Sequence, residues 1–206
     1  MTRFFSALLL GLALAAPAAA QTPAAYGSAA YYNLALSNTP VAVKAAPGLL
    51  TGFGCYNTNA AVEYLLLFDV SPVRMSITGT TNGTTSTSSN VLHFAATPAN
   101  VVKGQGIIDT TTGASIAAGT TVVSTTATTV TMSANAAGAG VGGTDGITFF
   151  SVPKAVVPLT ASTVTNSNWP IGIAFPASSI NAAVTSTGTP YGAAAGSALA
   201  CNFTYN

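Results

Sequence analysis

The sequence predicts an all-β protein, and three observations support this. Apolar residues alternate with small or polar ones in several short runs, most clearly at the end of the chain, where Leu199, Cys201, Phe203 and Tyr205 share one strand phase. Gly, Asn and Pro separate the runs at close spacing, as in β-sandwiches and β-barrels. No segment after the first twenty residues shows a sustained helical period.

The other strand-like runs are short. They lie at 49–55, 62–70, 91–94, 107–108, 120–124, 129–133, 147–152, 171–175 and 180–184. The first two flank the turn signal Asn57-Thr58-Asn59, so we expect them to form a hairpin. Thr78 to Asn90 is nearly all small and polar, which favours a long loop or a weak hairpin. A transmembrane barrel is disfavoured because its strands need about ten alternating residues each.

The first twenty residues have the pattern of a secretory signal peptide. Arg3 supplies the positive start, an apolar stretch follows over 4–16, and Ala18-Ala19-Ala20 forms a small-residue cleavage site before Gln21. A membrane anchor is the alternative, but the apolar run is short compared with the roughly 20 residues that span a bilayer. We expect a secreted, extracellular or cell-surface protein, with the periplasm as the other compartment, and no transmembrane segment after signal cleavage.

Charged residues make up only 4% of the chain, whereas hydrophobic residues make up 49%. The cations beyond the leader are Lys44, Arg74, Lys103 and Lys154, and the anions are Glu63, Asp69, Asp109 and Asp145. Scattered cations do not form the basic cluster that nucleic acids require, so no nucleic-acid partner is expected. Low charge also removes like-charge repulsion between copies, which favours self-association.

Two cysteines, Cys55 and Cys201, remain after the leader. A secreted location permits a disulfide, and a pair of buried thiols is the alternative. Cys55 shares a strand phase with Phe53, and Cys201 shares one with Phe203, so both are expected to point into a core. This common orientation favours the disulfide.

The residues offer little for catalysis. His93 is the single histidine, and no nucleophile-elbow motif accompanies it. Glu63 and Asp69 are too far apart along one predicted strand to act as a carboxylate pair, and nothing places Asp109 beside Asp145. We therefore expect no catalytic residues, no metal site and no cofactor, and a secreted hydrolase is the least favoured function.

An aromatic residue beside amides is a common arrangement in sugar-binding sites. Trp169, near Asn166 and Asn168, forms such a candidate ligand contact. The favoured alternative is that Trp169 covers a core. Aromatic candidates for the same sugar-binding role cluster near the start of the processed chain at Tyr26, Tyr31 and Tyr32. The favoured alternative assigns these tyrosines to an N-terminal strand.

Two stretches resemble known β-modules. The segments APGLLTGFGCYNTN over 46–59, YLLLFD over 64–69 and WPIGIAF over 169–175 resemble small β-sandwich decoration or tail modules of phage and prophage particles. The segments GTTVVS over 119–124 and VTMSANA over 130–136 resemble a β-module of bacterial surface and phage-tail proteins.

The resemblance implies a jelly-roll-like β-sandwich interrupted by a smaller inserted β-domain. Residues 21–73 and 151–206 would form the outer sandwich, and the Thr/Gly-rich residues 74–150 would form the insertion. It implies no catalytic residue. A signal peptide departs from the phage pattern, because virion proteins assemble in the cytoplasm.

Composition and this resemblance together predict a secreted non-enzymatic structural protein. It would self-associate into a surface layer, filament or particle, and the segment Ala29 to Leu36 would add to a neighbouring copy as a strand. The alternatives are a carbohydrate-binding or adhesin module, with a glycan as partner, and a phage-derived decoration protein.

Overall fold

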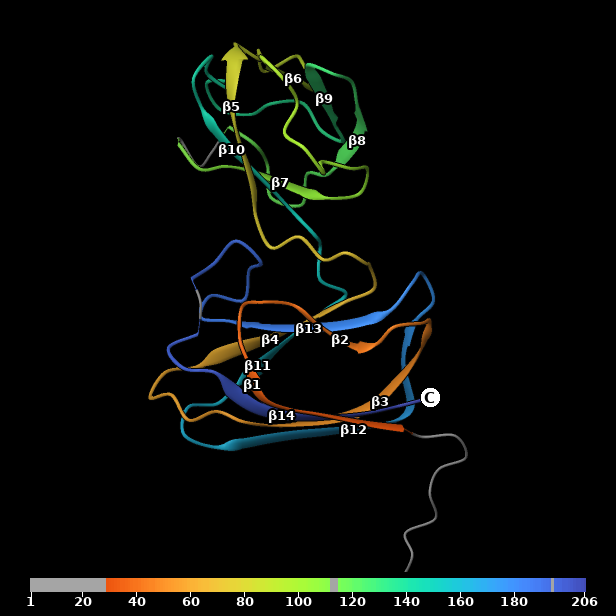
Figure 1. Cartoon of the computed structure of the whole chain (residues 1–206). Helices are drawn as coiled ribbons and strands as arrows, with labels where there is room; N and C mark the ends of the chain where they lie inside the picture. The colour runs from red at the N-terminus through yellow and green to blue at the C-terminus, as the bar shows by residue number, and fades with distance from the viewer. Residues whose placement is uncertain (1–28, 112–114, 194) are drawn as a thin grey trace, which may run out of the picture.

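The computed structural model describes residues 29–111, 115–193 and 195–206, so the predicted signal peptide and Tyr26 lie outside the described residues. The described residues form fourteen strands and no helix, arranged in three antiparallel sheets (Figure 1). The predicted all-β class is confirmed.

The first four-stranded sheet, here called sheet A, joins both ends of the described chain. Its strand order is β1-β14-β3-β12. The strands are β1 (Ala29–Leu36), β14 (Leu199–Tyr205), β3 (Gly48–Tyr56) and β12 (Val164–Phe175). β1 and β12 form the two edges, and β1, the segment expected to add to a neighbouring copy, pairs on one side with β14 of its own chain.

The second four-stranded sheet, sheet B, lies across from sheet A in Figure 1. Its strand order is β11-β4-β13-β2. The strands are β11 (Ala155–Leu159), β4 (Glu63–Phe68), β13 (Ile180–Thr185) and β2 (Val41–Lys44).

One hydrophobic core fills the space between sheets A and B. Inward-facing side chains from all eight strands form a single buried cluster, in which Phe53, Phe175 and Phe203 come from sheet A and Leu65 and Val184 come from sheet B. Side chains on a strand alternate between its two faces, so most of the strands contribute alternate residues to this core. Burial of these apolar groups is the main force that holds the two sheets together.

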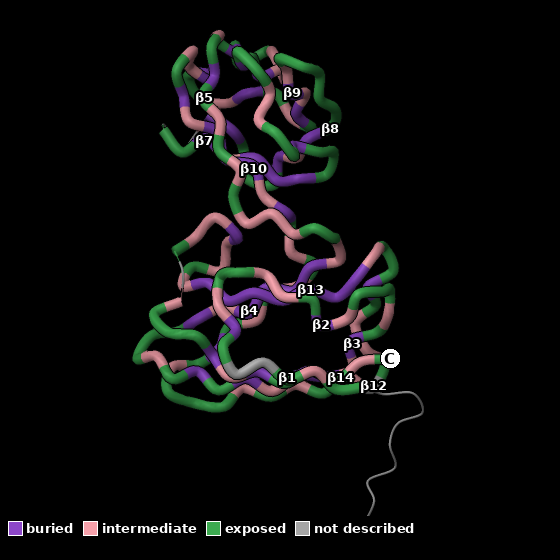
Figure 2. The backbone as a smooth tube through the Cα atoms, in the orientation of Figure 1, coloured by how far each residue is buried: buried purple, intermediate pink, exposed green. Residues whose placement is uncertain are grey.

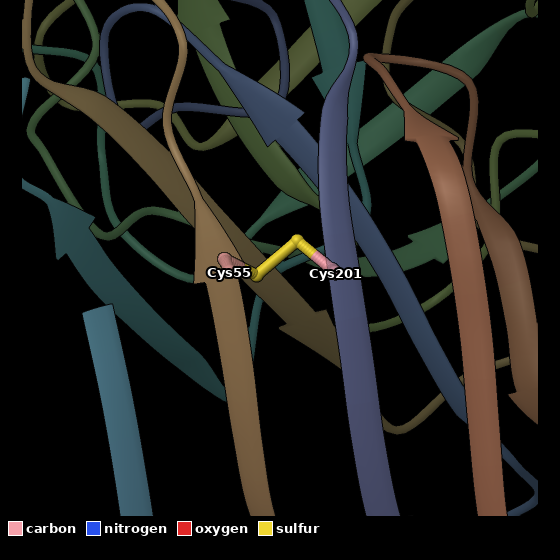
Figure 3. The surroundings of a disulfide bond; sticks show 2 residues. All are labelled: Cys55 and Cys201. Carbon is pink, nitrogen blue, oxygen red and sulfur yellow. A yellow bond between two sulfur atoms is a disulfide. The ribbon is translucent and has the colours of Figure 1, made fainter. Parts of the chain in front are cut away.

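The disulfide between Cys55 and Cys201 belongs to the same core. The two residues are directly opposite each other on β3 and β14, with both side chains buried (Figure 3). The predicted pairing is confirmed.

The third sheet contains six strands in the order β7-β10-β5-β6-β9-β8, all lying between Ile77 and Phe150. The strands are β5 (Ile77–Gly83), β6 (Val91–Phe94), β7 (Gly106–Asp109), β8 (Val122–Thr125), β9 (Thr129–Met132) and β10 (Gly146–Phe150). It has its own buried cluster, which includes Leu92, Val130, Met132, Ile147 and Phe149.

Two short connecting segments, 69–76 and 151–154, join the six-stranded sheet to sheet B (Figure 1). The first covers the outer face of sheet B, where Val70, Val73 and Met75 pack on a small cluster that contains Leu66 and Phe68. Both faces of sheet B are therefore covered, and Figure 2 shows the largely buried course of β4 and β13.

One local expectation, the hairpin between the runs at 49–55 and 62–70, was wrong. The segments around Leu49 and Val62 do contain strands, but β3 belongs to sheet A and β4 to sheet B, so they form no hairpin. The chain passes from sheet A to sheet B between β3 and β4. The side chain of Asn57 fixes this connection, because its Nδ2 donates to the carbonyls of Ala61 and Leu159.

The polar segment from Thr78 to Asn90 was expected to be a long loop or a weak hairpin, and the structure has the hairpin: β5 and β6 pair antiparallel on either side of residues 84–90. The first part of the segment is strand β5, which pairs with both β10 and β6 near the middle of the six-stranded sheet. Threonine is β-branched and favours strands, and alternate positions of β5 face outward, so small polar residues are tolerated there.

Candidate functional site

The outer face of sheet A is the candidate site. It faces away from the six-stranded sheet (Figure 1), and none of the residues in its four strands is Asp, Glu, Lys or Arg. We call it the asparagine–tyrosine face, and its residues are Tyr32, Gly52, Gly54, Tyr56, Val164, Asn166, Asn168, Asn202 and Thr204.

The strand register places these residues in rows across the sheet. Tyr32 on β1 is opposite Asn202 on β14, Asn202 is opposite Gly54 on β3, and Gly54 is opposite Asn166 on β12. Directly opposite residues on one face are close enough for their side chains to interact. One row thus combines an exposed aromatic ring, two amides and a glycine.

Two glycines form the floor of this face. A Cβ added to Gly54 would meet the side-chain oxygens of Asn166 and Asn202, and one added to Gly52 would lie 2.7 Å from Oδ1 of Asn168. The amide groups therefore lean over backbone that carries no side chain. The result is two adjacent shallow hollows of about 250 and 240 Å³, which share Gly54, Asn166 and Asn202.

The polar groups of this face are available to a partner. In the described part of the chain, the side chains of Asn166, Asn168 and Asn202 make no hydrogen bond, and Asn166 and Asn168 are exposed. Each amide offers two N–H donors and one acceptor oxygen. Tyr32 and Tyr56, 71% and 46% exposed, add aromatic surface on either side of Asn202.

Trp169 does not belong to this face. It is half-buried, packs on the core between the sheets and contacts Phe53 with ring centroids 5.5 Å apart. Asn168 and Trp169 are consecutive on one strand, so their side chains point to opposite faces. The structure therefore brings together Asn166 and Asn168, which the sequence singled out, and separates them from Trp169.

Sequence reasoning missed Tyr32, Tyr56 and Asn202 as partners of these asparagines. The alternation over 199–205 already placed Asn202 on the side opposite Cys201. Which strands are neighbours was not visible in the sequence, because β1, β14, β3 and β12 are far apart in the chain.

The groups considered for catalysis are dispersed. His93 is exposed on β6, opposite Gly83 and Thr129. Glu63 and Asp69 flank β4 at its two ends; Glu63 is buried against Asn59, whereas Asp69 pairs with Lys154 at 3.4 Å.

Asp109 and Asp145 are both buried in the six-stranded sheet. Asp109 ends β7, opposite Ile147, and its Oδ1 accepts a hydrogen bond from the backbone N–H of Thr111. Asp145 precedes β10 and accepts a hydrogen bond from the N–H of Gly142. Among the residues that the structure describes, no group of three or more His, Cys, Asp or Glu side chains is placed to hold a metal ion.

Comparison with known proteins gives no relative. No protein-family model matches the chain, and neither the curated proteins nor the solved structures contain a match. A search of the described residues for a helix long and apolar enough to cross a membrane also finds none.

Proposed function

We propose that this protein is a secreted, non-enzymatic structural protein that self-associates through the asparagine–tyrosine face of sheet A. The observation that carries the proposal is the absence of formal charge from all four strands of that sheet. In the same proposal, sheets A and B form a jelly-roll-like β-sandwich, and residues 74–150 form a β-domain inserted into it.

An uncharged face suits association with a second copy. In a two-fold symmetric dimer each patch meets the same patch on its partner, so a charge close to the two-fold axis would face its own copy. The asparagine–tyrosine face has no such conflict, and its amides are both donors and acceptors, which makes the face complementary to itself.

Exposed apolar side chains on sheet A add contact area. Tyr32, Tyr56 and Val164 project from the outer face, and Ile171 is 90% exposed at the bulge that interrupts the pairing of β12 with β3. Aromatic residues are enriched in protein interfaces because they bury a large apolar area and keep a polar tip. A secreted location is compatible with the disulfide, which persists in oxidising compartments.

Sedimentation velocity over a range of protein concentrations tests the proposal. Wild-type protein is expected to associate, whereas the double variant Asn166→Lys/Asn202→Lys, which places two like charges on the face, is expected to remain monomeric. Val123→Lys is the matched control, because Val123 is an exposed strand residue on β8 outside sheet A. Wild-type protein that stays monomeric at every concentration would contradict the proposal. A lysine double variant that associates as strongly as wild type would contradict it too.

A neutral glycan is the second candidate partner. The row of Tyr32, Asn202, Gly54 and Asn166 favours it, because a sugar ring stacks on an aromatic side chain while amides bind its hydroxyl groups. A glycan array with wild type and with Tyr32→Ala and Asn202→Ala distinguishes the two partners. If each substitution abolishes glycan binding, and wild-type protein sediments as a monomer, the face binds sugars rather than a second copy. A phage-derived decoration role stays a prediction.

A further inference from the structure

A second, larger cleft lies where the connecting segments meet the six-stranded sheet. Its volume is about 470 Å³, within the range of roughly 300 to 1,000 Å³ that is usual for small-molecule sites. The residues that matter for its chemistry are Val70, Pro72, Arg74, Val102, Lys103 and Val152.

Hydrogen bonds fix both walls of this cleft. On one side the two connecting segments are joined reciprocally: the N–H of Arg74 donates to Oγ of Ser151 at 2.9 Å, and the N–H of Ser151 donates to the carbonyl of Arg74 at 2.7 Å. On the other side the buried amide of Gln105 accepts from the N–H of Val102 and donates to the carbonyl of Asn100. The cleft is therefore formed in advance of any ligand.

Two of the chain's five basic residues line this cleft. The salt bridge found within the described residues joins Lys154 to Asp69, so neither Arg74 nor Lys103 has a carboxylate partner there. Nη2 of Arg74 donates to Oδ1 of Asn100 at 3.3 Å, which holds the guanidinium against the turn that carries Lys103. A guanidinium carries five N–H donors, so further donors remain for an anion.

The rest of the lining is mainly apolar. Val102 and Val152 are 54% and 49% exposed, and Val70 and Pro72 extend the same surface. Exposed valines beside unpaired cations suit a ligand with a hydrocarbon part and an anionic end. We infer that this cleft binds a small amphipathic carboxylate, with Arg74 and Lys103 on the carboxylate and the valines on the chain. This inference does not depend on the proposed role of sheet A.

Three small probes test the ligand class on the full chain. Octanoate carries both chain and charge, octanamide keeps the chain without the charge, and acetate keeps the charge without the chain. In ¹⁵N-resolved NMR titrations, octanoate is expected to shift the amides of Val102, Lys103, Gly104 and Val152 in a saturable way. Octanamide and acetate are each expected to bind at least about ten-fold more weakly, since each loses one class of contact. Equal binding of all three, or octanoate shifts confined to other residues, would overturn the inference.

Charge-removing variants test the two basic residues. Lys103→Gln and Arg74→Gln are each expected to weaken octanoate binding by about ten-fold, because each removes a charge-assisted contact. Lys44→Gln is the matched control, because Lys44 lies on β2, away from the cleft, and should leave binding unchanged. Lys103 is exposed and its replacement should fold, so Lys103→Gln decides the matter even if Arg74→Gln does not fold. Wild-type affinity in Lys103→Gln would contradict the inference.

Discussion

Cys55 and Cys201 are direct cross-strand partners on β3 and β14, and their disulfide joins residues 146 positions apart in sequence. All the strands of the six-stranded sheet, and all those of sheet B except β2, lie between them in the chain. The bond therefore closes a loop that contains most of the described protein. Its two side chains also belong to the core between the sheets.

Removing this disulfide should lower stability strongly. A cross-link that closes so long a loop restricts the unfolded chain, and the chain-entropy model gives up to about 5 kcal/mol of stabilisation. The double variant Cys55→Ala/Cys201→Ala is therefore expected to unfold at a much lower urea concentration than wild type. Reductant should lower the wild-type midpoint and leave that of the variant unchanged. Superimposable curves for oxidised wild type and the variant would contradict this expectation.

Trp169→Ala should act on stability rather than on ligand binding. The indole is half-buried against Phe53 and the core, so its loss should cost about 2 kcal/mol of unfolding free energy. Ile171→Ala on the same strand is the control; its side chain is exposed, and the change is expected to stay within about 0.5 kcal/mol. Chemical denaturation measures both. A Trp169→Ala protein as stable as Ile171→Ala would show that the indole adds nothing to the core.

Thr185→Val is expected to stabilise the protein. Thr185 is fully buried on β13, and within the described structure its hydroxyl has no hydrogen-bond partner. Valine has nearly the same shape without the unpaired polar group, so a gain of up to about 1 kcal/mol is expected. The comparison is Thr81→Val, which should cost about 2 kcal/mol. There the hydroxyl donates to the carbonyl of Gly142 and accepts from the N–H of Asp145.

Thermal unfolding of the two threonine variants checks the direction of each effect. A rise in midpoint for Thr185→Val together with a fall for Thr81→Val is the expected pair. If both variants lose stability equally, the Thr185 hydroxyl must have a partner in solution.

Glu63 should be important as a hydrogen-bond acceptor. Its buried Oε1 accepts from Nδ2 of Asn59 and from the N–H of Gly196. Glu63→Gln keeps an acceptor oxygen and should change the unfolding free energy by no more than about 1 kcal/mol. Glu63→Leu leaves both donors without this acceptor and should cost about 2 kcal/mol. Equal stability of the two variants, measured by urea unfolding, would exclude this role.

Local patterns in the sequence predicted strands well, because a half-buried strand must alternate apolar and polar side chains. The alternation of Leu199, Cys201 and Phe203 correctly placed Cys201 in the core, and the same reasoning for Cys55 predicted the disulfide. The polar strand β5 was expected only as an arm of a weak hairpin, with a long loop as the alternative, because Thr78 and Thr80 carry no apolar periodicity. Its position is set by pairing with β10 and β6, together with the buried and hydrogen-bonded side chain of Thr81.

Strand order was the part that the sequence did not reveal. Asn57 illustrates why, because the segment 57–59 has the composition of a tight turn. The Asn57 side chain nevertheless donates a hydrogen bond to the carbonyl of Leu159, about a hundred residues away, and the chain continues into sheet B. The candidate face depends on such long-range order. Asn166 and Asn168 were visible as amides near Trp169, but their neighbours Asn202 and Tyr32 come from the two ends of the described chain.

The two connecting segments, 69–76 and 151–154, are paired with each other, which affects how the chain tolerates replacement of the residues between them. Arg74 and Ser151 are hydrogen-bonded neighbours, so the chain leaves the two four-stranded sheets and returns to them at almost the same point. The entropy of closing a loop grows slowly with its length. A short turn that replaces the residues between Arg74 and Ser151 is therefore expected to leave the strand pairing of sheet B intact, because it would span only the short distance that their hydrogen bonds already close.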